Sequence, residues 1–409
     1  MAHRRSVLAV VLCALPLALA ACQGGSSPPG FVTDTSVRFN GYMLADQGDA
    51  YYYFQYGTDT GYGSVTPTRT VASGSNVTFS ETATGLQPST TYHWRMCGND
   101  VGKSPACDQD RTLQTTGQDP VVAAAGDIAC DPSDPAYNGG AGTSSSCKMA
   151  ATSNLLVGTG LSAVLPLGDI QYDCGSPGDF AASYDPTWGR VKSITTPVPG
   201  NHEYKTADPD AYGGHDCDTT GHASGYYGYF GAAAGDPSKG YYSYDLGTWH
   251  IVVLNTTLAC SLISCSAGSA QERWLAADLA AHPAACTLAL WHEPRFSSKL
   301  PSTKTAAFWQ DLYAANADVV LNGHVHDYER FAPQTPSAVA DPVRGIREFV
   351  VGTGGKSSEN IGATPAANSE VQGKTYGVLR LTLHADSYDW QFVPASGSGF
   401  TDSGTTGCH

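Results

Sequence analysis

The stretch 319-VVLNGHVHDYER-330 runs from an apolar segment into Asn-Gly and then presents two histidines, His324 and His326, separated by one valine. A short apolar run rich in β-branched residues is typical of a buried strand. If the extended conformation continues, residues two apart face the same side, so both imidazoles can point toward the same site. The pair alone is equally compatible with an ordinary strand, and its meaning depends on partners elsewhere in the chain.

Other apolar runs end in the same way, with polar side chains directly after the strand-like segment. They are 121-VVAAAGD-127, 161-LSAVLPLGDIQY-172, 194-ITTPVPGNHE-203 and 286-CTLALWH-292. In four of the five segments a glycine precedes the first polar residue, which lets the backbone turn sharply and lets a side chain approach a central object closely. The residues placed in this way are Asp127, Asp169, Tyr172, Asn201, His202, Glu203 and His292.

Each of these signals has an ordinary explanation when it is taken singly. Gly-Asp after a strand is usually a turn or a helix cap, and a lone histidine at a strand end is usually structural. Together, five strand ends offer carboxylate, phenol, amide and imidazole donors, which are more ligands than one ion needs. Their occurrence in order within one layout therefore predicts a metal site.

Strand-like and helix-like segments alternate from Val121 onward. Apolar residues at helical spacing predict helices at 148–156, 271–281 and 305–315, and later strands are expected at 348–352, 376–384 and 388–393, completing a second sheet. Alternating strands and helices predict an α/β layered fold with functional groups at the carboxyl ends of the strands.

The N-terminal part of the chain has a different pattern. Residues 31–116 contain short alternating or aromatic runs between turns rich in glycine and threonine, which predicts a small β-sandwich. In its late strand, Tyr92, Trp94 and Met96 are expected to face inward. Residues 112–120 are the expected linker.

Composition narrows the class of protein. Of the 409 residues only 14% are charged, the net charge is −15, and no Lys/Arg-rich run follows the first few residues. Most of such a surface repels a nucleic-acid backbone, so nucleic acid is excluded as a binding partner. Local metal charge can still attract a small anion.

The N-terminus has the features of an export signal. A basic start, 3-HRR-5, precedes an apolar run over 7–19 that is too short to span a bilayer. The segment 19-LAAC-22 resembles the bacterial lipobox, which predicts a signal peptide over 1–21, lipidation of Cys22 and a tether over 22–30. The alternative is ordinary cleavage near residues 18–20.

Cysteine parity favours the lipoprotein. Removing Cys13 with the signal and Cys22 by lipidation leaves ten of the twelve cysteines, an even number that suits disulfides in an exported protein. Pairing neighbours in sequence is the simplest arrangement, although the sequence does not prove the connectivity. The resulting pairs are Cys97–Cys107, Cys130–Cys147, Cys174–Cys217, Cys260–Cys265 and Cys286–Cys408.

One glycine-rich segment is a false lead. The segment 352-GTGGKSS-358 looks like a phosphate-binding loop, but the glycine that the P-loop motif requires before it is replaced by Val350. The P-loop interpretation therefore fails.

The complete ordered set resembles the purple acid phosphatases of the metallophosphoesterase superfamily. The motifs that carry the resemblance are Gly126-Asp127, Gly168-Asp169-x-x-Tyr172, Gly200-Asn201-His202-Glu203, His292 and Gly323-His324-x-His326. The likeness covers nearly the whole mature chain and indicates a bacterial, exported member. It implies a four-layer αββα sandwich over 120–409, preceded by a fibronectin type III-like sandwich over 31–116.

The resemblance also implies two metal ions bridged by Asp169. One, Fe(III), is expected to be held by Asp127, Tyr172 and His326, and the other, a divalent zinc, iron or manganese ion, by Asn201, His292 and His324. Such a centre implies hydrolysis of phosphate monoesters by a metal-activated hydroxide. His202 matches the histidine that contacts the phosphate and assists protonation of the leaving group, and Glu203 is expected to support the ligands.

The chain departs from the plant enzymes after His292, where their further histidines are missing. Arg295 is expected to supply a phosphate contact instead, with Lys299 as the alternative. The rival functions are a phosphodiesterase or nucleotidase that uses the same metals, and a non-catalytic adhesion or binding scaffold. The expected partner is a small phosphate ester, and membrane contact is expected only through the lipid anchor. The protein is expected on the outer face of the cell membrane, or secreted.

Overall fold

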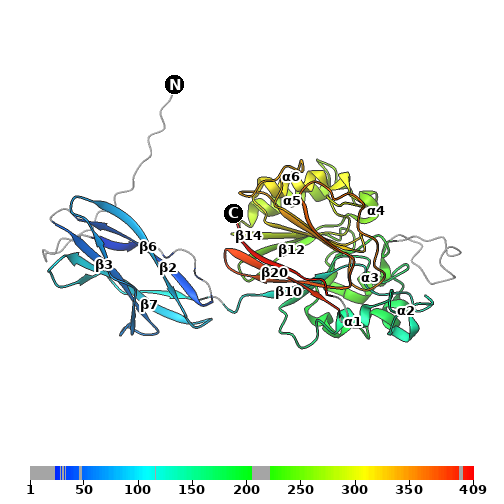
Figure 1. Ribbon diagram of the computed structural model, residues 1–409, viewed down its shortest axis with the longest axis horizontal. Coiled ribbons are helices and arrows are strands. Elements are labelled where there is room, and N and C mark those ends of the chain that lie inside the picture. The colour runs from blue at the N-terminus through cyan, green and yellow to red at the C-terminus, as the bar shows by residue number, and fades with distance from the viewer. Residues whose placement is uncertain are drawn as a thin grey trace, which may run out of the picture. The chain divides into compact units, whose positions relative to one another are not determined.

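The computed structural model describes residues 24–409 except 28, 30–31, 33, 46–47, 116, 205–221 and 396–398. Contacts divide the chain into two compact units, Met1–Thr115 and Thr116–His409, whose chain course Figure 1 shows in colour from blue to red. The division falls within the linker expected at 112–120. The predicted signal peptide, with Cys13 and Cys22, lies outside the described residues.

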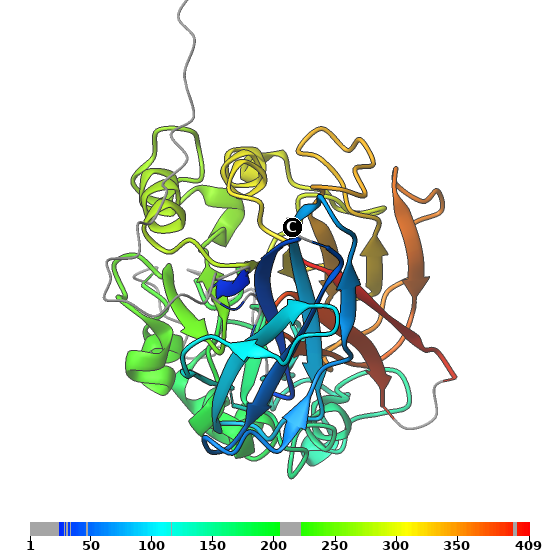
Figure 2. The same cartoon turned by 90° about the vertical axis from the view of Figure 1, so that its left-hand side faces the viewer.

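The first unit is a sandwich of two antiparallel sheets, seen from its own side in Figure 2. Along β7, Tyr92, Trp94 and Met96 are buried, as predicted, because residues two apart on a strand share a face. In the described residues one sheet contains β1 (Gly24–Ser27), β2 (Ser36–Leu44) and β6 (Asn76–Thr84), and the other contains β3 (Ala50–Gly57), β4 (Ser64–Val65), β5 (Arg69–Val71), β7 (Thr91–Asp100), β8 (Ala106–Cys107) and β9 (Arg111–Gln114).

The tether expected at 22–30 is wrong for residues 24–27. They form β1, which pairs antiparallel with β2 from Gly24 opposite Met43 to Ser27 opposite Asn40. The backbone N–H of Ser26 also donates to Asp108 at 2.8 Å. Without β1, the edge of β2 would leave a row of backbone N–H and C=O groups without hydrogen bonds. The Gly-Gly-Ser-Ser segment pairs with these groups, and its small side chains do not obstruct the pairing.

The second unit stacks two sheets between helices. In the described residues the five-stranded sheet has the order β11 (Ala163–Pro166), β10 (Val121–Ala125), β19 (Gly377–Leu383), β20 (Ser387–Pro394) and β21 (Asp402–Gly407). The seven-stranded sheet has the order β12 (Tyr242–Leu246), β13 (Trp249–Val253), β14 (Cys286–Leu290), β15 (Val319–Asn322), β17 (Arg347–Val351), β16 (Tyr328–Phe331) and β18 (Ser369–Gly373).

Helices cover the outer faces of both sheets. Figure 1 shows α5 (Ala270–Ala281) and α6 (Ala306–Ala314) over the seven-stranded sheet, and α1 (Met149–Ser153), α2 (Pro177–Asp179) and α3 (Ser224–Phe230) on the side of the five-stranded sheet. This layering confirms the αββα fold expected for the second unit.

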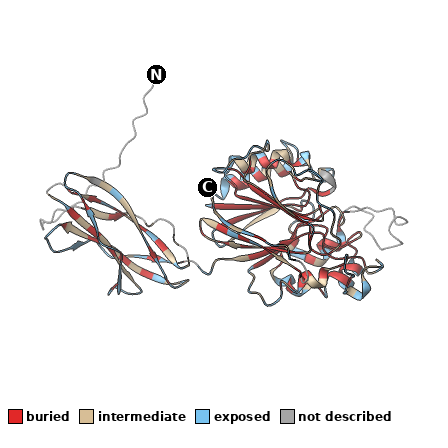
Figure 3. Cartoon of the chain, in the orientation of Figure 1, coloured by how far each residue is buried: buried red, intermediate tan, exposed pale blue. Residues whose placement is uncertain are grey.

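Alternate residues of the central strands pack into different hydrophobic cores, one on each face of the sheet. Ile251 and Val253 belong to the core between the two sheets, whereas Val252 and Leu254 pack on the other face with Trp309 of α6. Because both faces of these strands are buried, as the red central strands of Figure 3 show, their sequences are continuously apolar rather than alternating.

The late strands form where expected but not in one sheet. β17 pairs in parallel with β15 of the seven-stranded sheet, whereas β19 and β20 extend the five-stranded sheet beyond β10. The expectation that they together complete one second sheet is therefore wrong. The apolar run before Asn201 is likewise no regular strand, and makes only isolated parallel bridges, Val164 with Thr195 and Leu167 with Val198.

Disulfides join segments of both units. Among the described residues four of the predicted pairs form, and Cys217, the predicted partner of Cys174, lies outside them. The confirmed pairs are Cys97–Cys107, Cys130–Cys147, Cys260–Cys265 and Cys286–Cys408.

Candidate metal centre

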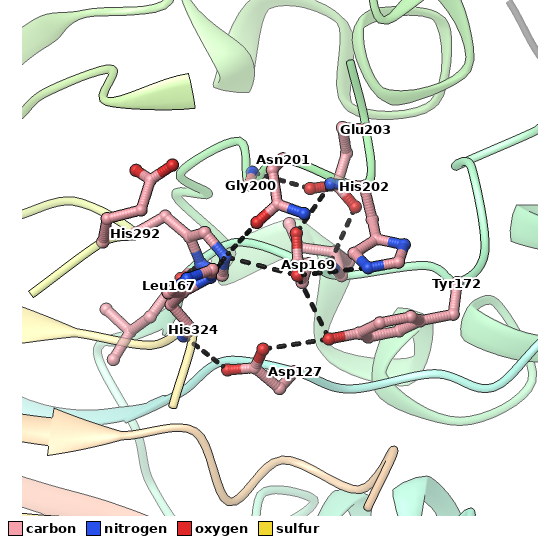
Figure 4. Close-up of polar contacts among 12 residues, drawn as sticks. Asp127, Leu167, Asp169, Tyr172, Gly200, Asn201, His202, Glu203, His292 and His324 are labelled. Atoms are coloured by element: carbon pink, nitrogen blue, oxygen red, sulfur yellow. Dashed lines mark hydrogen bonds and ion pairs between the residues drawn. The ribbon is translucent and has the colours of Figure 1, made fainter. Parts of the chain in front are cut away.

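Most of the predicted donor residues lie in one cluster, as Figure 4 shows. Asp127 follows β10 and Asp169 follows β11 in the five-stranded sheet, while His292 follows β14 and His324 follows β15 in the seven-stranded sheet. Because β10 and β11 are parallel, and β14 and β15 are parallel, the carboxyl ends within each sheet lie at the same edge. The site is thus assembled from both sheets.

Two glycines allow the strand ends to approach one another. Gly168 has φ +84°, and a Cβ at this position would lie 2.5 Å from Nδ1 of His292. A Cβ on Gly200 would lie 2.1 Å from the backbone nitrogen of Asp169. Any side chain at either position would separate the segments that bring the donors together, which is the reason for glycine there.

One group of donors forms a small triangle. Asp127 Oδ1 lies 3.0 Å from Tyr172 Oη and 3.0 Å from His326 Nε2. Tyr172 Oη and His326 Nε2 are also 3.0 Å apart. Ligand atoms that share one ion at about 2.1 Å are themselves about 3 Å apart when they coordinate at right angles. The triangle therefore has the size of one face of a coordination shell.

A second group surrounds the Nε2 atom of His292. This atom lies 3.2 Å from Asn201 Oδ1 and 3.2 Å from His324 Nδ1. It also lies 3.3 Å from Asp169 Oδ2. Asp169, His292 and His324 together have the mutual spacing of a possible metal-binding group.

The same oxygen of Asp169 belongs to both groups. Its Oδ2 atom lies 3.1 Å from Tyr172 Oη as well as 3.3 Å from His292 Nε2. The phenol has one proton, yet Asp127, Asp169 and His326 all present possible acceptors to it at 3.0–3.1 Å. This excess of acceptors around one donor fits cations better than protons.

Burial and charge shift the titration of these residues strongly. Burial, together with the negative charges of Asp127 and Asp169, raises the pKa of Tyr172 well above its usual value. Burial opposes ionisation of Asp169, but His292 and His202 hold its pKa well below the ordinary range. Such opposed shifts within one buried cluster are typical of functional sites.

Hydrogen bonds from outside the donor set orient the imidazoles. The Nδ1 atom of His292 lies 2.8 Å from the carbonyl oxygen of Leu167, and Nδ1 of His326 lies 2.6 Å from Ser357 Oγ. These contacts turn the Nε2 atoms of both rings toward the centre. Nothing in the sequence indicates that the Leu167 carbonyl oxygen orients the His292 ring. Ser357 lies in the rejected P-loop segment, which directly follows β17 and is a further strand end at this edge.

Glu203 supports the backbone of the site, as predicted. Its carboxylate accepts hydrogen bonds from the N–H groups of Ile170 at 2.8 Å, Gln171 at 3.1 Å and Gly200 at 2.7 Å. It therefore ties the turn after Asp169 to the turn before Asn201. Burial and the nearby Asp169 raise the pKa of Glu203 to about 7.

His202 lies beside the cluster, whereas Arg295 does not join it. The Nε2 atom of His202 is 3.8 Å from Asp169 Oδ2, and Nδ1 lies 2.5 Å from the carbonyl oxygen of Asp173. The backbone N–H of Arg295 donates to Glu348 at 2.9 Å, and Arg295 Nε is buried without a hydrogen-bond partner among the described residues. A phosphate contact by Arg295 stays a prediction.

His324 and His326 converge by turns and not by strand alternation. β15 ends at Asn322, and His324 has φ +69°, which no strand residue adopts. The N–H of Val325 donates to the Gly323 carbonyl at 2.8 Å, and that of Asp327 donates to the Val325 carbonyl at 2.7 Å. The expectation of an extended His-x-His is therefore wrong, although both imidazoles reach the site.

Another cluster of metal-binding residue types has unsuitable geometry. His250, Asp278 and His282 lie together, but the two imidazole rings stack almost parallel, with centroids 4.9 Å and planes 14° apart. The in-plane lone pairs of parallel rings point in parallel planes and do not converge on one ion. His250 is instead held between Asp245 at 2.8 Å and Asp278 at 2.9 Å.

Comparison with known proteins finds similarity to purple acid phosphatases. The chain is 28% identical over 309 residues to purple acid phosphatase 15 of Arabidopsis thaliana, covering 66% of this chain and 52% of that protein. It is 26% identical over 322 residues to purple acid phosphatase 23 of the same plant, covering 71% and 63%. The structure of purple acid phosphatase PPD1 from yellow lupin seeds matches with a TM-score of 0.56 and 16% identity, over 94% of this chain and 74% of that one.

The two-sheet sandwich of the second unit has the fold of that purple acid phosphatase structure. No family model matches the chain, but the curated relatives that it resembles are purple acid phosphatases. It spans about half to two thirds of the length of the two curated relatives. In the described part of the chain, every helix is too short or too polar to span a membrane.

Proposed function

We propose that this chain hydrolyses phosphate monoesters at a centre of two metal ions. Asp127, Tyr172 and His326 hold Fe(III), with Asp169 as the shared ligand. The phenolate of Tyr172 is a strongly donating anion that suits a trivalent ion. The second ion is divalent zinc, iron or manganese, bound by Asn201, His292 and His324.

The observation that carries this proposal is the position of Asp169 Oδ2 between Tyr172 Oη at 3.1 Å and His292 Nε2 at 3.3 Å. A carboxylate oxygen shared by two donor groups supports two adjacent ions, because one ion would leave half of the donors unused. On one side of it lie the Asp127 carboxyl group and a phenol that would bind a metal ion as phenolate, and on the other side lie only neutral imidazole and amide groups. This asymmetry favours ions of different charge.

Two ions held by these residues would supply Lewis acidity for a phosphate ester and for a water molecule. The protein then has to position the substrate and supply a proton to the leaving group. His202 suits that role because its Nδ1 lies 2.5 Å from the Asp173 carbonyl, which orients Nε2 toward the donor cluster. In this orientation Nε2 can bind a phosphate oxygen or give a proton to the leaving group.

Metal analysis and turnover test the proposal together. The purified protein is expected to contain two metal ions per chain and to hydrolyse phenyl phosphate faster than diphenyl phosphate. Asp169→Asn is expected to lose metal and at least about a hundredfold in kcat/KM. Asp278→Asn is the matched control, since Asp278 is also a buried carboxylate beside a histidine but lies outside the donor cluster.

The outcomes separate the alternatives. Preference for the diester would favour the phosphodiesterase, and a metal-free protein without esterase activity would favour the scaffold. Equal metal loss in Asp169→Asn and Asp278→Asn would mean that the site responds to general destabilisation, and would contradict the assignment of Asp169.

Export and lipid anchoring belong to the proposal. The cysteine count supports lipidation of Cys22, because four predicted disulfides form without Cys13 or Cys22. Mass spectrometry of the mature N-terminus tests this directly. An acylated Cys22 is expected, and an unmodified terminus near residue 20 would contradict it.

A further inference from the structure

A cavity of about 630 Å³ lies beside the donor cluster, between the segment after β14 and the segment after β17. Its lining is mostly polar and includes two lysines. The lining residues that matter here are Ser298, Lys299, Glu359, Asn360 and Lys374.

The cavity shares a wall with the metal centre. The N–H of Glu359 donates to the carbonyl oxygen of His326 at 2.8 Å, and Ser357 Oγ lies 2.6 Å from His326 Nδ1. The same loop packs against the other side of the cavity, where a Cβ on Gly362 would lie 2.4 Å from the carbonyl oxygen of Ser298. The loop is therefore held between a proposed ligand and the opposite wall.

The lysines near this loop differ in how their charge is balanced. Lys299 forms an ion pair with Glu359, and Lys356 pairs with Asp134 at 2.7 Å. Lys374 Nζ instead donates to the neutral amide oxygen of Asn360 at 2.9 Å. Among the described residues no carboxylate lies within ion-pair distance of Lys374.

In a chain with a net charge of −15, an ammonium at a cavity without a carboxylate partner leaves a local positive charge. Most of the surface repels anions, so a local positive charge at a cavity beside the phosphate site attracts them selectively. The contact with Asn360 holds the ammonium at the cavity without neutralising it. An ammonium binds a carboxylate or phosphate oxygen as a point charge and does not require a particular orientation.

We propose that this cavity binds a second anionic group of the substrate, a carboxylate or a further phosphate on the leaving-group side, with Lys374 as its cationic contact. The inference rests on the proposed phosphatase function and specifies the substrate class. Esters with two anionic groups, one at the metals and one in the cavity, are then the preferred substrates. Lys299 contributes less, because Glu359 already balances its charge.

Three esters test this with the metal-loaded full chain: phenyl phosphate, 3-carboxyphenyl phosphate and its neutral isostere, 3-carbamoylphenyl phosphate. We expect kcat/KM for the carboxylate to exceed that for the carbamoyl ester about fivefold, near the upper limit for a solvent-exposed ion pair. Lys374→Gln is expected to abolish this ratio through KM, since the contact is present in both the bound substrate and the transition state. High salt should reduce the ratio in the same way.

Lys304→Gln is the matched control, because Lys304 is an exposed lysine outside the cavity. It is expected to keep the preference. Hydrolysis of all three esters at equal kcat/KM, or a preference that survives Lys374→Gln, would overturn this inference and leave the phosphatase proposal standing. Failure to hydrolyse any of the esters would overturn both.

Discussion

Tyr172 and His292 contact the same carboxylate oxygen, since Asp169 Oδ2 lies 3.1 Å from the phenol oxygen and 3.3 Å from the imidazole Nε2. Tyr172 follows a strand of one sheet and His292 follows a strand of the other. The shared oxygen therefore joins the two halves of the sandwich as well as the two proposed metal sites. Variants on either side of Asp169 should affect different ions.

Replacing Tyr172 with phenylalanine should remove the colour of the protein without unfolding it. A visible charge-transfer band requires the phenolate oxygen on ferric iron, while Asp127 and His326 remain as ligands. Absorption spectra and iron content measure the effect. Tyr184→Phe is the control, because Tyr184 is also fully buried but its hydroxyl has no hydrogen-bond partner among the described residues. A band that persists in Tyr172→Phe would contradict the assignment.

Removing the ions with a chelator should lower thermal stability. If the proposed ions bind, they would stabilise the folded state by about 4 kcal/mol at a free concentration one thousand times the dissociation constant. Without them, the buried carboxyl groups of Asp127 and Asp169 lie close to the other donor atoms with no cation between them. Calorimetry with and without dipicolinate measures the shift in Tm. The Asp169→Asn variant should respond much less, and an equal response would indicate that the chelator acts elsewhere.

Replacing Glu203 with glutamine should weaken metal binding although Glu203 is not a proposed ligand. The amide cannot accept from all three N–H groups that the carboxylate satisfies, so the turns beside Asp169 and Asn201 lose their support. Losses of about 10- to 100-fold in metal affinity are typical for such partners of ligands. Competition with a metal-sensitive dye measures the affinity.

Glu348→Gln provides the comparison for that experiment. Glu348 is a buried carboxylate that accepts from the N–H groups of Arg295 and Phe296, away from the donor cluster. The Glu348→Gln variant should leave the metal affinity unchanged. Similar affinity losses in both variants would show that Glu203 acts only through stability.

Replacing Asp311 with asparagine should stabilise the protein at high pH. Burial, with a smaller contribution from Glu272, raises the pKa of Asp311 to about 6. The folded state then binds the proton more tightly than the unfolded chain, whose aspartate titrates near 4, so the stability from this group is lost as the pH rises through about 4 to 6. After allowance for partial exposure, the gain at pH 8 is about 1 kcal/mol.

Urea unfolding at pH 4.5 and pH 8 tests this pH dependence, with the larger gain expected at pH 8. Asp341→Asn should have the opposite sign, because a hydrogen bond from Tyr313 lowers the pKa of Asp341. A gain for Asp311→Asn that is independent of pH would contradict the titration argument.

Removing two disulfides should have unequal effects on stability. Cys286–Cys408 closes 122 residues, whereas Cys260–Cys265 closes only 5. The loop-entropy model predicts losses of about 5 and about 2 kcal/mol for the respective pairs of serine substitutions. Urea unfolding of the two double variants measures the difference, and equal losses would show that chain entropy in the unfolded state does not govern it.

The sequence alone predicted the layered fold and the donor residues for a local reason. Most of the candidate donors follow an apolar run within a few residues, and a strand buried on both faces must be apolar throughout, so its end is visible in the sequence. Parallel strands then bring their ends to one edge. Asp127, Asp169, Tyr172, His292 and the two histidines of the opening stretch are all placed by this rule.

The assignment of strands to sheets depended on contacts that no local pattern records. β17 pairs with β15, while β19 pairs with β10, although all of them are similar apolar runs. The same limit applies to β1, whose Gly-Gly-Ser-Ser sequence has no strand propensity and forms only because the edge of β2 accepts it.

The sequence by itself determined which strand ends carry the side chains that we propose as metal ligands. Only the tertiary structure decided how they meet: His324 and His326 converge through successive turns, and the rings of His292 and His202 are oriented by the carbonyl oxygens of Leu167 and Asp173. The physical reason is that every residue has a backbone carbonyl. A sequence cannot mark the one that a fold will use.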